Sequence, residues 1–191
     1  MPIISSKGGL SSGGYGQFAY AANLAPTNSF FAIASYTVPS GGQAVVSFDV
    51  IPQIYTHLQI RMSTKDATGL ASQGIRMNKD GSTTTNYDYH RLYGTGAAVA
   101  SSGAASTDIA IIGISSTHFG TTIIDLLDYR NTNKYKTVKS LSGWDGNGSG
   151  WVGLWSALYM NTSAITSVEL STAAGTQNWT QYSTFSLYGV N

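Results

Sequence analysis

The sequence predicts an all-β protein: an antiparallel β-sandwich, in jelly-roll form, with an extended N-terminal arm. Many Thr, Tyr and Ile residues and few Glu and Lys residues make a strand-forming composition. Short apolar runs recur from Phe30 onward with turn residues between them, about ten or eleven in all. No helical crossover separates these runs, so we expect two packed antiparallel sheets. The jelly-roll is a common topology for such a chain.

Length and composition indicate one folded domain behind the arm. The chain has 191 residues, of which 42% are hydrophobic and 10% are charged, a balance opposite to that of disordered proteins. We expect residues 1–28 to form the arm and residues 29–191 to form the sandwich. Tyr15, Phe18 and Tyr20 are large side chains within the Ser-rich and Gly-rich arm, so we expect it to dock on a partner. An unstructured terminus is the alternative.

The charge and cysteine content exclude several classes of function. A formal net charge of +1 gives no electrostatic basis for binding nucleic acid or an anionic membrane. The absence of cysteine excludes disulfides, thiolate metal sites and cysteine nucleophiles. The N-terminus lacks the apolar core of a signal peptide, and no apolar run is long enough for a membrane span. We therefore expect synthesis in a cytoplasm and a surface that tolerates close association.

In the first half of the domain, strands are predicted from the alternation of apolar and polar residues and from the turn residues between them. Pro39 and Pro52 follow the first two apolar runs, and Leu58, Ile60 and Met62 alternate with polar residues and so share one face. The predicted strands are Phe30–Val38, Ala44–Ile51, His57–Ser63, Gly74–Asn78 and Asn86–Gly94. The last of these places Tyr87, Tyr89, Arg91 and Tyr93 on one side.

The sequence also predicts a tight turn and a loop between strands, and it contains one segment that could be a helix. Asp80-Gly81 predicts a tight hairpin turn, since this dipeptide supplies positive φ angles. Residues 94–106 are small and are read as a loop. Residues 151–160 could form a helix, but their β-rich flanks favour a strand. The predicted strands of the second half are Ile109–Ser115, Thr121–Tyr129, Lys134–Trp144, Gly150–Met160, Ile165–Ser171 and Tyr182–Val190.

No catalytic, metal or cofactor site is predicted. The loop from Asp145 to Gly150 resembles the start of a calcium loop, but its twelfth position is Ser156 instead of a bidentate Glu. A glycine-rich hairpin turn is the favoured reading. Asp125 and Asp128, three residues apart on a strand, point to opposite faces and do not form a glycosidase pair. The three His residues are far apart in sequence, so we predict that the protein is not an enzyme.

Aromatic and basic side chains are the candidate partner contacts. Trp144, Trp151 and Trp155 could form a flat platform for a sugar or a protein, and filling the core is the alternative. Lys134 and Lys136 lie on one face of a predicted strand and could dock an acidic surface. The alternative is an edge strand whose lysines prevent aggregation.

Four segments carry a resemblance to a known group of proteins. They are DYRNTNKYKTVKSLSGWDGNGSGWVGLWSALYMNTSAITSVEL, the terminal FSLYGV, the block IPQIYTHLQIRMSTK and the N-terminal SSGGYGQFA. Together they resemble small virion proteins of tailed bacteriophages, over nearly the whole chain. The resemblance implies a non-enzymatic structural protein that is made in the host bacterial cytoplasm and placed on the virion surface.

Within that group we expect a capsid decoration (cement) protein on the outer head surface, as a homotrimer. Its partners would be the major capsid protein or other virion proteins, contacted by the arm (Ser5–Tyr20) and by the aromatic loop around Trp144–Trp155. The alternative is a tail-fibre or receptor-binding module that recognises a host surface glycan through exposed rings. We expect no nucleic-acid or membrane partner.

Overall fold

A computed structural model describes residues 29–68, 73–80, 86–106, 109–112, 115–172 and 177–191. Internal contacts divide the chain into two units, Met1–Phe31 and Ala32–Asn191, and the sandwich belongs to the second. The described residues contain twelve β-strands. None of them lies in a helix long and apolar enough to cross a membrane.

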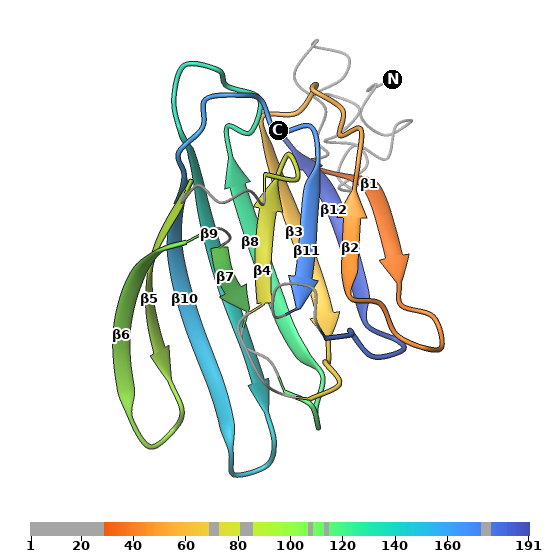
Figure 1. Ribbon diagram of the computed structural model, residues 1–191, viewed down its shortest axis with the longest axis vertical. Helices are drawn as coiled ribbons and strands as arrows, with labels where there is room; N and C mark the ends of the chain where they lie inside the picture. The colour runs from red at the N-terminus through yellow and green to blue at the C-terminus, as the bar shows by residue number, and fades with distance from the viewer. Residues whose placement is uncertain (1–28, 69–72, 81–85, 107–108, 113–114, 173–176) are drawn as a thin grey trace, which may run out of the picture. The chain divides into compact units, whose positions relative to one another are not determined.

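The strands form two antiparallel sheets (Figure 1). The large sheet has eight strands, in the order β1 (Phe30–Thr37), β12 (Thr184–Val190), β3 (His57–Thr64), β8 (Gly120–Leu127), β9 (Lys136–Asp145), β10 (Gly150–Tyr159), β5 (Tyr87–Gly94) and β6 (Val99–Ser106). The small sheet has four strands, in the order β2 (Val45–Phe48), β11 (Val168–Thr172), β4 (Gln73–Met77) and β7 (Ile109–Ile112).

The strand pairing confirms the predicted β-sandwich and has jelly-roll order. β1 neighbours β12, β2 pairs with β11, β3 with β8, and β4 with β7. These four nested pairs are what results when one long antiparallel hairpin is rolled into two layers. Two further hairpins interrupt the scheme: β5–β6 lies between β4 and β7 in sequence, and β9–β10 lies between β8 and β11. Both extend the large sheet beyond β8.

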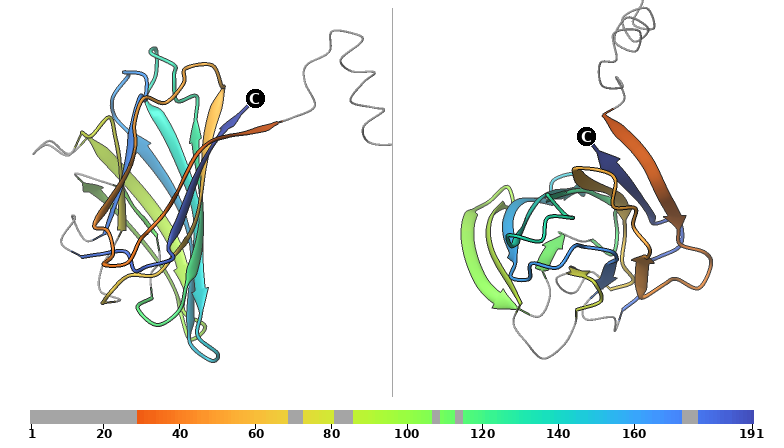
Figure 2. Two further views of the ribbon diagram at one scale, coloured as in Figure 1. Left: turned by 90° about the vertical axis from the view of Figure 1, so that its right-hand side faces the viewer. Right: turned by 90° about the horizontal axis from the view of Figure 1, so that it is seen from above.

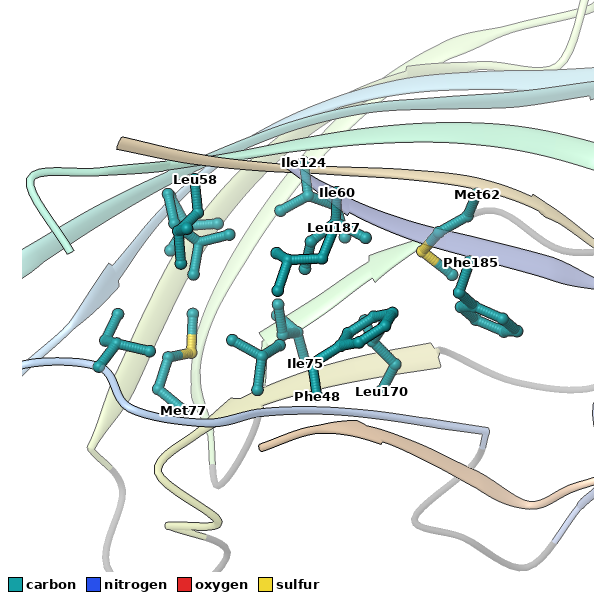
Figure 3. Close-up of a cluster of buried hydrophobic side chains, with 14 of the residues drawn as sticks. Phe48, Leu58, Ile60, Met62, Ile75, Met77, Ile124, Leu170, Phe185 and Leu187 are labelled. Carbon is teal, nitrogen blue, oxygen red and sulfur yellow. The ribbon is translucent and has the colours of Figure 1, made fainter. Parts of the chain in front are cut away.

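The two sheets form two layers (Figure 2), and the core side chains lie between them (Figure 3). Leu58, Ile60 and Met62 of β3 are buried on one face, as their alternation predicted. They face Ile75 of β4 and Leu170 of β11, which are fully buried as well. Each such side chain contributes about 1.5–3 kcal/mol when it is removed from water. This apolar layer stabilises the packing of the two sheets.

The prediction of a hairpin at Asp80-Gly81 was wrong. Asn78 and Lys79 do have positive φ angles of 54° and 53°, and the Asp80 N–H donates to the Met77 carbonyl at 2.9 Å. However, β4 pairs with β11 and β7, whereas β5 lies in the other sheet. The turn therefore ends β4 without pairing it with the next strand.

The prediction of a loop over residues 94–106 was also wrong. Residues 99–106 form β6, which pairs with β5 along its whole length, from Gly94↔Val99 to Tyr87↔Ser106. Its side chains are small, so no alternation of large apolar residues marks it as a strand. Backbone hydrogen bonds to β5 stabilise it instead. By contrast, the strand predicted at residues 151–160 is confirmed as β10.

Candidate functional site: an outer sheet face and a hairpin-tip pocket

The outer face of the large sheet carries a row of exposed apolar side chains. Ile123 of β8 is paired with Leu141 of β9, Leu141 with Leu154 of β10, and Leu154 with Leu92 of β5. Their exposed fractions are 42%, 53%, 47% and 53%. Residues paired in register point to the same side of a sheet. The four residues therefore form one continuous stripe, the outer apolar row.

The outer apolar row is broadened by neighbours on the same face. Val152 follows it on β10 and is 56% exposed, and Leu127 lies beyond it on β8. Across four strands the row spans about 14 Å at the usual strand spacing. Single exposed apolar residues are common on protein surfaces, whereas contiguous apolar patches mark interaction sites. The outer face has the character of a contact surface.

Opposite charges lie beside the outer apolar row. Two residues further along the strands, Asp125 of β8 is paired with Lys139 of β9. The Gln59 side-chain amide donates to Asp125 Oδ1 at 2.8 Å, and Arg61 Nε donates to Gln59 Oε1 at 2.7 Å. The guanidinium of Arg61 also lies 5.0 Å from the centre of the Tyr188 ring. The apolar stripe is thus bordered by polar groups of both signs.

A second feature lies at the tips of the two inserted hairpins, at the lower end of Figure 1. Because β10 pairs with both β9 and β5, their turns are brought side by side. Between the turns is a cavity of about 310 Å³, which we call the hairpin-tip pocket. It is lined by Gly94, Thr95, Gly96, Trp144, Asp145, Gly148, Ser149, Gly150, Trp151 and Val152.

Stacked rings support the hairpin-tip pocket. Trp151 is paired in register with Trp144. The Trp151 ring is 5.9 Å from Tyr93, at an interplanar angle of 25°, and 5.0 Å from Trp155. Trp144 lies parallel to His118, with centroids 6.4 Å apart. These contacts hold both tryptophan rings in place, and each is half-buried.

The loop from Asp145 to Gly150 is a tight turn, as predicted. The Asn147 N–H donates to Asp145 Oδ1 at 2.9 Å, and the Gly146 N–H donates to the Ser149 carbonyl at 2.6 Å. Asn147 and Gly148 have φ angles of 57° and 102°, which are typical of a hairpin turn. In the part of the chain that the structure describes, no group of three or more His, Cys, Asp or Glu residues could hold a metal ion.

The two predicted lysine contacts differ in outcome. Lys134 is exposed, and its ammonium group donates to the Asp128 carboxylate. Lys136 is fully buried, so its prediction as a surface contact was wrong. Its ammonium group donates to the carbonyls of Lys134 at 3.1 Å and Thr162 at 3.0 Å, and burial lowers its pKa. Lys136 stabilises the ends of two loops.

The predicted aromatic contacts also separate into groups. Trp155 is buried in the core and is not on the surface, so that prediction was wrong. Trp144 and Trp151 line the hairpin-tip pocket. Tyr15, Phe18 and Tyr20 lie outside the described residues.

Asp125 and Asp128 have separate partners. They were expected on opposite faces of one strand, but β8 ends at Leu127 and Asp128 lies in the following turn, with a φ angle of 50°. Asp125 accepts from Gln59, whereas Asp128 contacts Lys134 and lies 3.5 Å from His57 Nδ1. The hydrogen bond from Lys134 lowers the pKa of Asp128. Both carboxylates therefore belong to local polar contacts on the sheet and its end.

Sequence reasoning missed the outer apolar row. A signal was present, because Ile123, Leu141 and Leu154 each occupy the strand phase opposite to the buried residues around them. Apolar residues in both phases indicate a strand with two apolar faces. The register across four strands cannot be read from such runs one at a time.

No protein family, curated protein or solved structure matches this chain.

Proposed function

We propose that the protein is a non-enzymatic structural component of a bacteriophage particle, a decoration protein of the outer head surface. In this proposal its subunits associate with one another through the outer apolar row, and the assembled subunits bind the major capsid protein. The observation that carries the proposal is the in-register stripe from Ile123 to Leu92 across four strands. Covering that stripe removes half-exposed leucine side chains from water, which favours association.

A second copy of the chain is the occupant that fits the outer face best. Asp125 and Lys139 are neighbours on this face, so two copies can each offer an acidic and a basic group to the other. The formal net charge of +1 gives little repulsion between copies. We expect three copies to associate, as a homotrimer.

The acidic residues support a structural role. Five of them bond or pair with neighbouring side chains: Asp49 with Lys79, Asp80 with Asn86, Asp125 with Gln59, Asp128 with Lys134, and Glu169 with Arg76. Glycoside hydrolysis, by contrast, uses a pair of carboxylates that flank one bond. Jelly-rolls are also found in viral capsids, although fold alone does not decide function.

The proposal is tested on particles of the phage that encodes the chain. Particles assembled without it are incubated with the purified full-length chain, washed, and imaged after immunogold labelling. We expect labelling over the head lattice. A Leu141→Thr/Leu154→Thr variant should label weakly, whereas Ile54→Thr, which changes an exposed apolar residue outside the row, should label fully. Label confined to the tail, or none, would refute the head-decoration role.

The N-terminal arm is proposed as a further contact with the capsid. Its motivation is the three large aromatic residues among small ones in residues 1–28. A chain without residues 1–20 should bind fewer particles in the same assay while keeping its association between copies. Undiminished particle binding would refute the role of the arm.

A further inference from the structure

We propose that the hairpin-tip pocket binds a neutral saccharide, with a sugar ring packed on Trp144 and Trp151. This site adjoins the outer apolar row at Val152 and does not depend on the role proposed for that row. Its position is set by β5–β6 and β9–β10, the two hairpins that extend the jelly-roll scheme. A volume of about 310 Å³ lies at the lower end of the range for small-ligand pockets.

The aromatic wall of the pocket is held rigid before any ligand arrives. Trp144 and Trp151 are directly paired across the two strands of one hairpin, so their rings lie on the same side. Tyr93 and Trp155 pack against Trp151, and His118 packs against Trp144. Rings that are already fixed lose little conformational entropy on binding. The C–H groups on one face of a pyranose match such a flat apolar surface.

Two exposed glycines line the rest of the pocket. A Cβ atom added at Gly96 or Gly148 would meet no atom within 4 Å. Both residues line the pocket and have positive φ angles, of 86° and 102°. Both glycines are exposed and face open space, so their polar backbone groups are accessible at the pocket. A ligand with many hydroxyl groups can use such donors and acceptors.

The charge of the lining selects against anionic ligands. Asp145 lines the pocket together with the hydroxyl groups of Thr95 and Ser149, and no Lys or Arg is among the lining residues that the structure describes. A carboxylate accepts hydrogen bonds from sugar hydroxyls and repels phosphate, sulfate or sugar carboxylate groups. These features favour neutral hexoses and N-acetylhexosamines over sialic or uronic acids.

The arrangement of the rings argues against a quaternary ammonium ligand. Such a cation is recognised by several rings that face it from different sides. Here Tyr93 is stacked on Trp151 at 25°, and His118 is parallel to Trp144 within 3°. The rings support one another along one wall instead of surrounding a point. A flat-faced sugar suits this wall better than a spherical cation.

The test uses the purified full-length chain and methyl glycosides of glucose, galactose, mannose, N-acetylglucosamine and glucuronic acid. Saturation-transfer NMR and tryptophan fluorescence report binding. We expect at least one neutral glycoside to bind with a dissociation constant on the order of 1 mM, and glucuronide to bind at least about tenfold more weakly. No saturation transfer from any neutral glycoside at about 10 mM would overturn the proposal.

Three variants assign the binding to this pocket. Trp144→Ala removes half of the aromatic wall and should weaken binding about tenfold. Gly96→Asn places a side chain that tolerates positive φ into the open space, and should weaken binding by a similar factor. Tyr182→Ala, at an exposed ring elsewhere, should bind like the native chain. Native affinity in both pocket variants, with native melting curves, would overturn the assignment.

Discussion

Lys136 shows how one charged side chain can be buried at a loop junction. Its ammonium group donates to the Lys134 and Thr162 carbonyls, with a longer contact of 3.4 Å to the Asn161 carbonyl. A buried carbonyl without a donor costs free energy, so these three acceptors benefit from one ammonium group. The sequence alone does not distinguish this buried lysine from the other lysines near it.

Replacing Lys136 by Met should lower the free energy of unfolding by about 2–3 kcal/mol, since the carbonyls lose a charged donor. Lys134→Met is the matched control, because it removes an exposed ion pair and should change stability by less than about 1 kcal/mol. Urea denaturation followed by tryptophan fluorescence measures both values. Equal stability of the two variants would contradict the structural role of Lys136.

A buried tyrosine pair predicts a loss of stability at alkaline pH. Tyr87 and Tyr159 are stacked with centroids 4.9 Å apart, and both are fully buried. Tyr87 accepts from the Met77 N–H at 2.9 Å, and Tyr159 donates to Asp80 at 3.1 Å. Burial raises the pKa of Tyr87, and it raises the pKa of Tyr159 to about 12.

Because their pKa values are raised, the two tyrosines hold protons in the folded state that the unfolded chain has already released. Their contribution to the free energy of unfolding is complete below the unfolded-state pKa of about 10. It falls as the pH rises above that value, by about 1.4 kcal/mol per pH unit for each tyrosine. Lys136 acts oppositely, since its pKa is lowered. Tyr159→Phe should therefore reduce the slope of unfolding free energy against alkaline pH by the amount that corresponds to about one proton. Unfolding free energies between pH 8 and 11.5 test this, and an unchanged slope would refute it.

At the scale of elements, the close approach of a loop to β12 depends on a glycine. Gly189 is buried in β12, and a Cβ atom there would overlap the root of the Tyr55 ring. Tyr55 is partly buried and packs against the core. The ring cannot move aside without opening that packing.

Gly189→Ala should destabilise the protein by about 1–3 kcal/mol because of this overlap. Gly94→Ala in β5 is the matched control: its Cβ would lie 3.7 Å from the Ala98 carbonyl oxygen, which is ordinary van der Waals contact. The control should be neutral or slightly stabilising, since Ala restricts the unfolded chain. Thermal denaturation of both variants measures this difference. Equal melting temperatures would contradict the predicted overlap at Gly189.

The elements that the sequence predicts well are those with strong alternation. β3 was predicted with its buried face, Leu58, Ile60 and Met62, because the opposite face is polar. β6 was not predicted, because small residues give no apolar period and its pairing with β5 decides its conformation. The hairpin predicted at Asp80-Gly81 was wrong, because the positive φ angles lie at Asn78 and Lys79 and because a turn alone does not say which sheet the chain enters next.

At the scale of the whole molecule, the contact surface depends on register. Leu92 lies about 50 residues from Leu141 in sequence, yet only Leu154 separates them across the sheet. The hairpin-tip pocket likewise combines residues of two insertions that are adjacent only after β10 pairs with β5. Trp144 and Trp151 could be proposed as contacts from their type. The outer apolar row could not, because several strands must be in place before it exists.

The most direct test of the central claim is sedimentation velocity of the full-length chain between about 1 and 100 µM. The claim is that the outer apolar row joins copies of the chain. It predicts that the native chain and Ile54→Thr sediment as the same oligomer, whereas Leu141→Thr/Leu154→Thr sediments as a 20.2 kDa monomer. A native chain that is monomeric throughout this range, or a double variant with the native oligomeric mass, would contradict it.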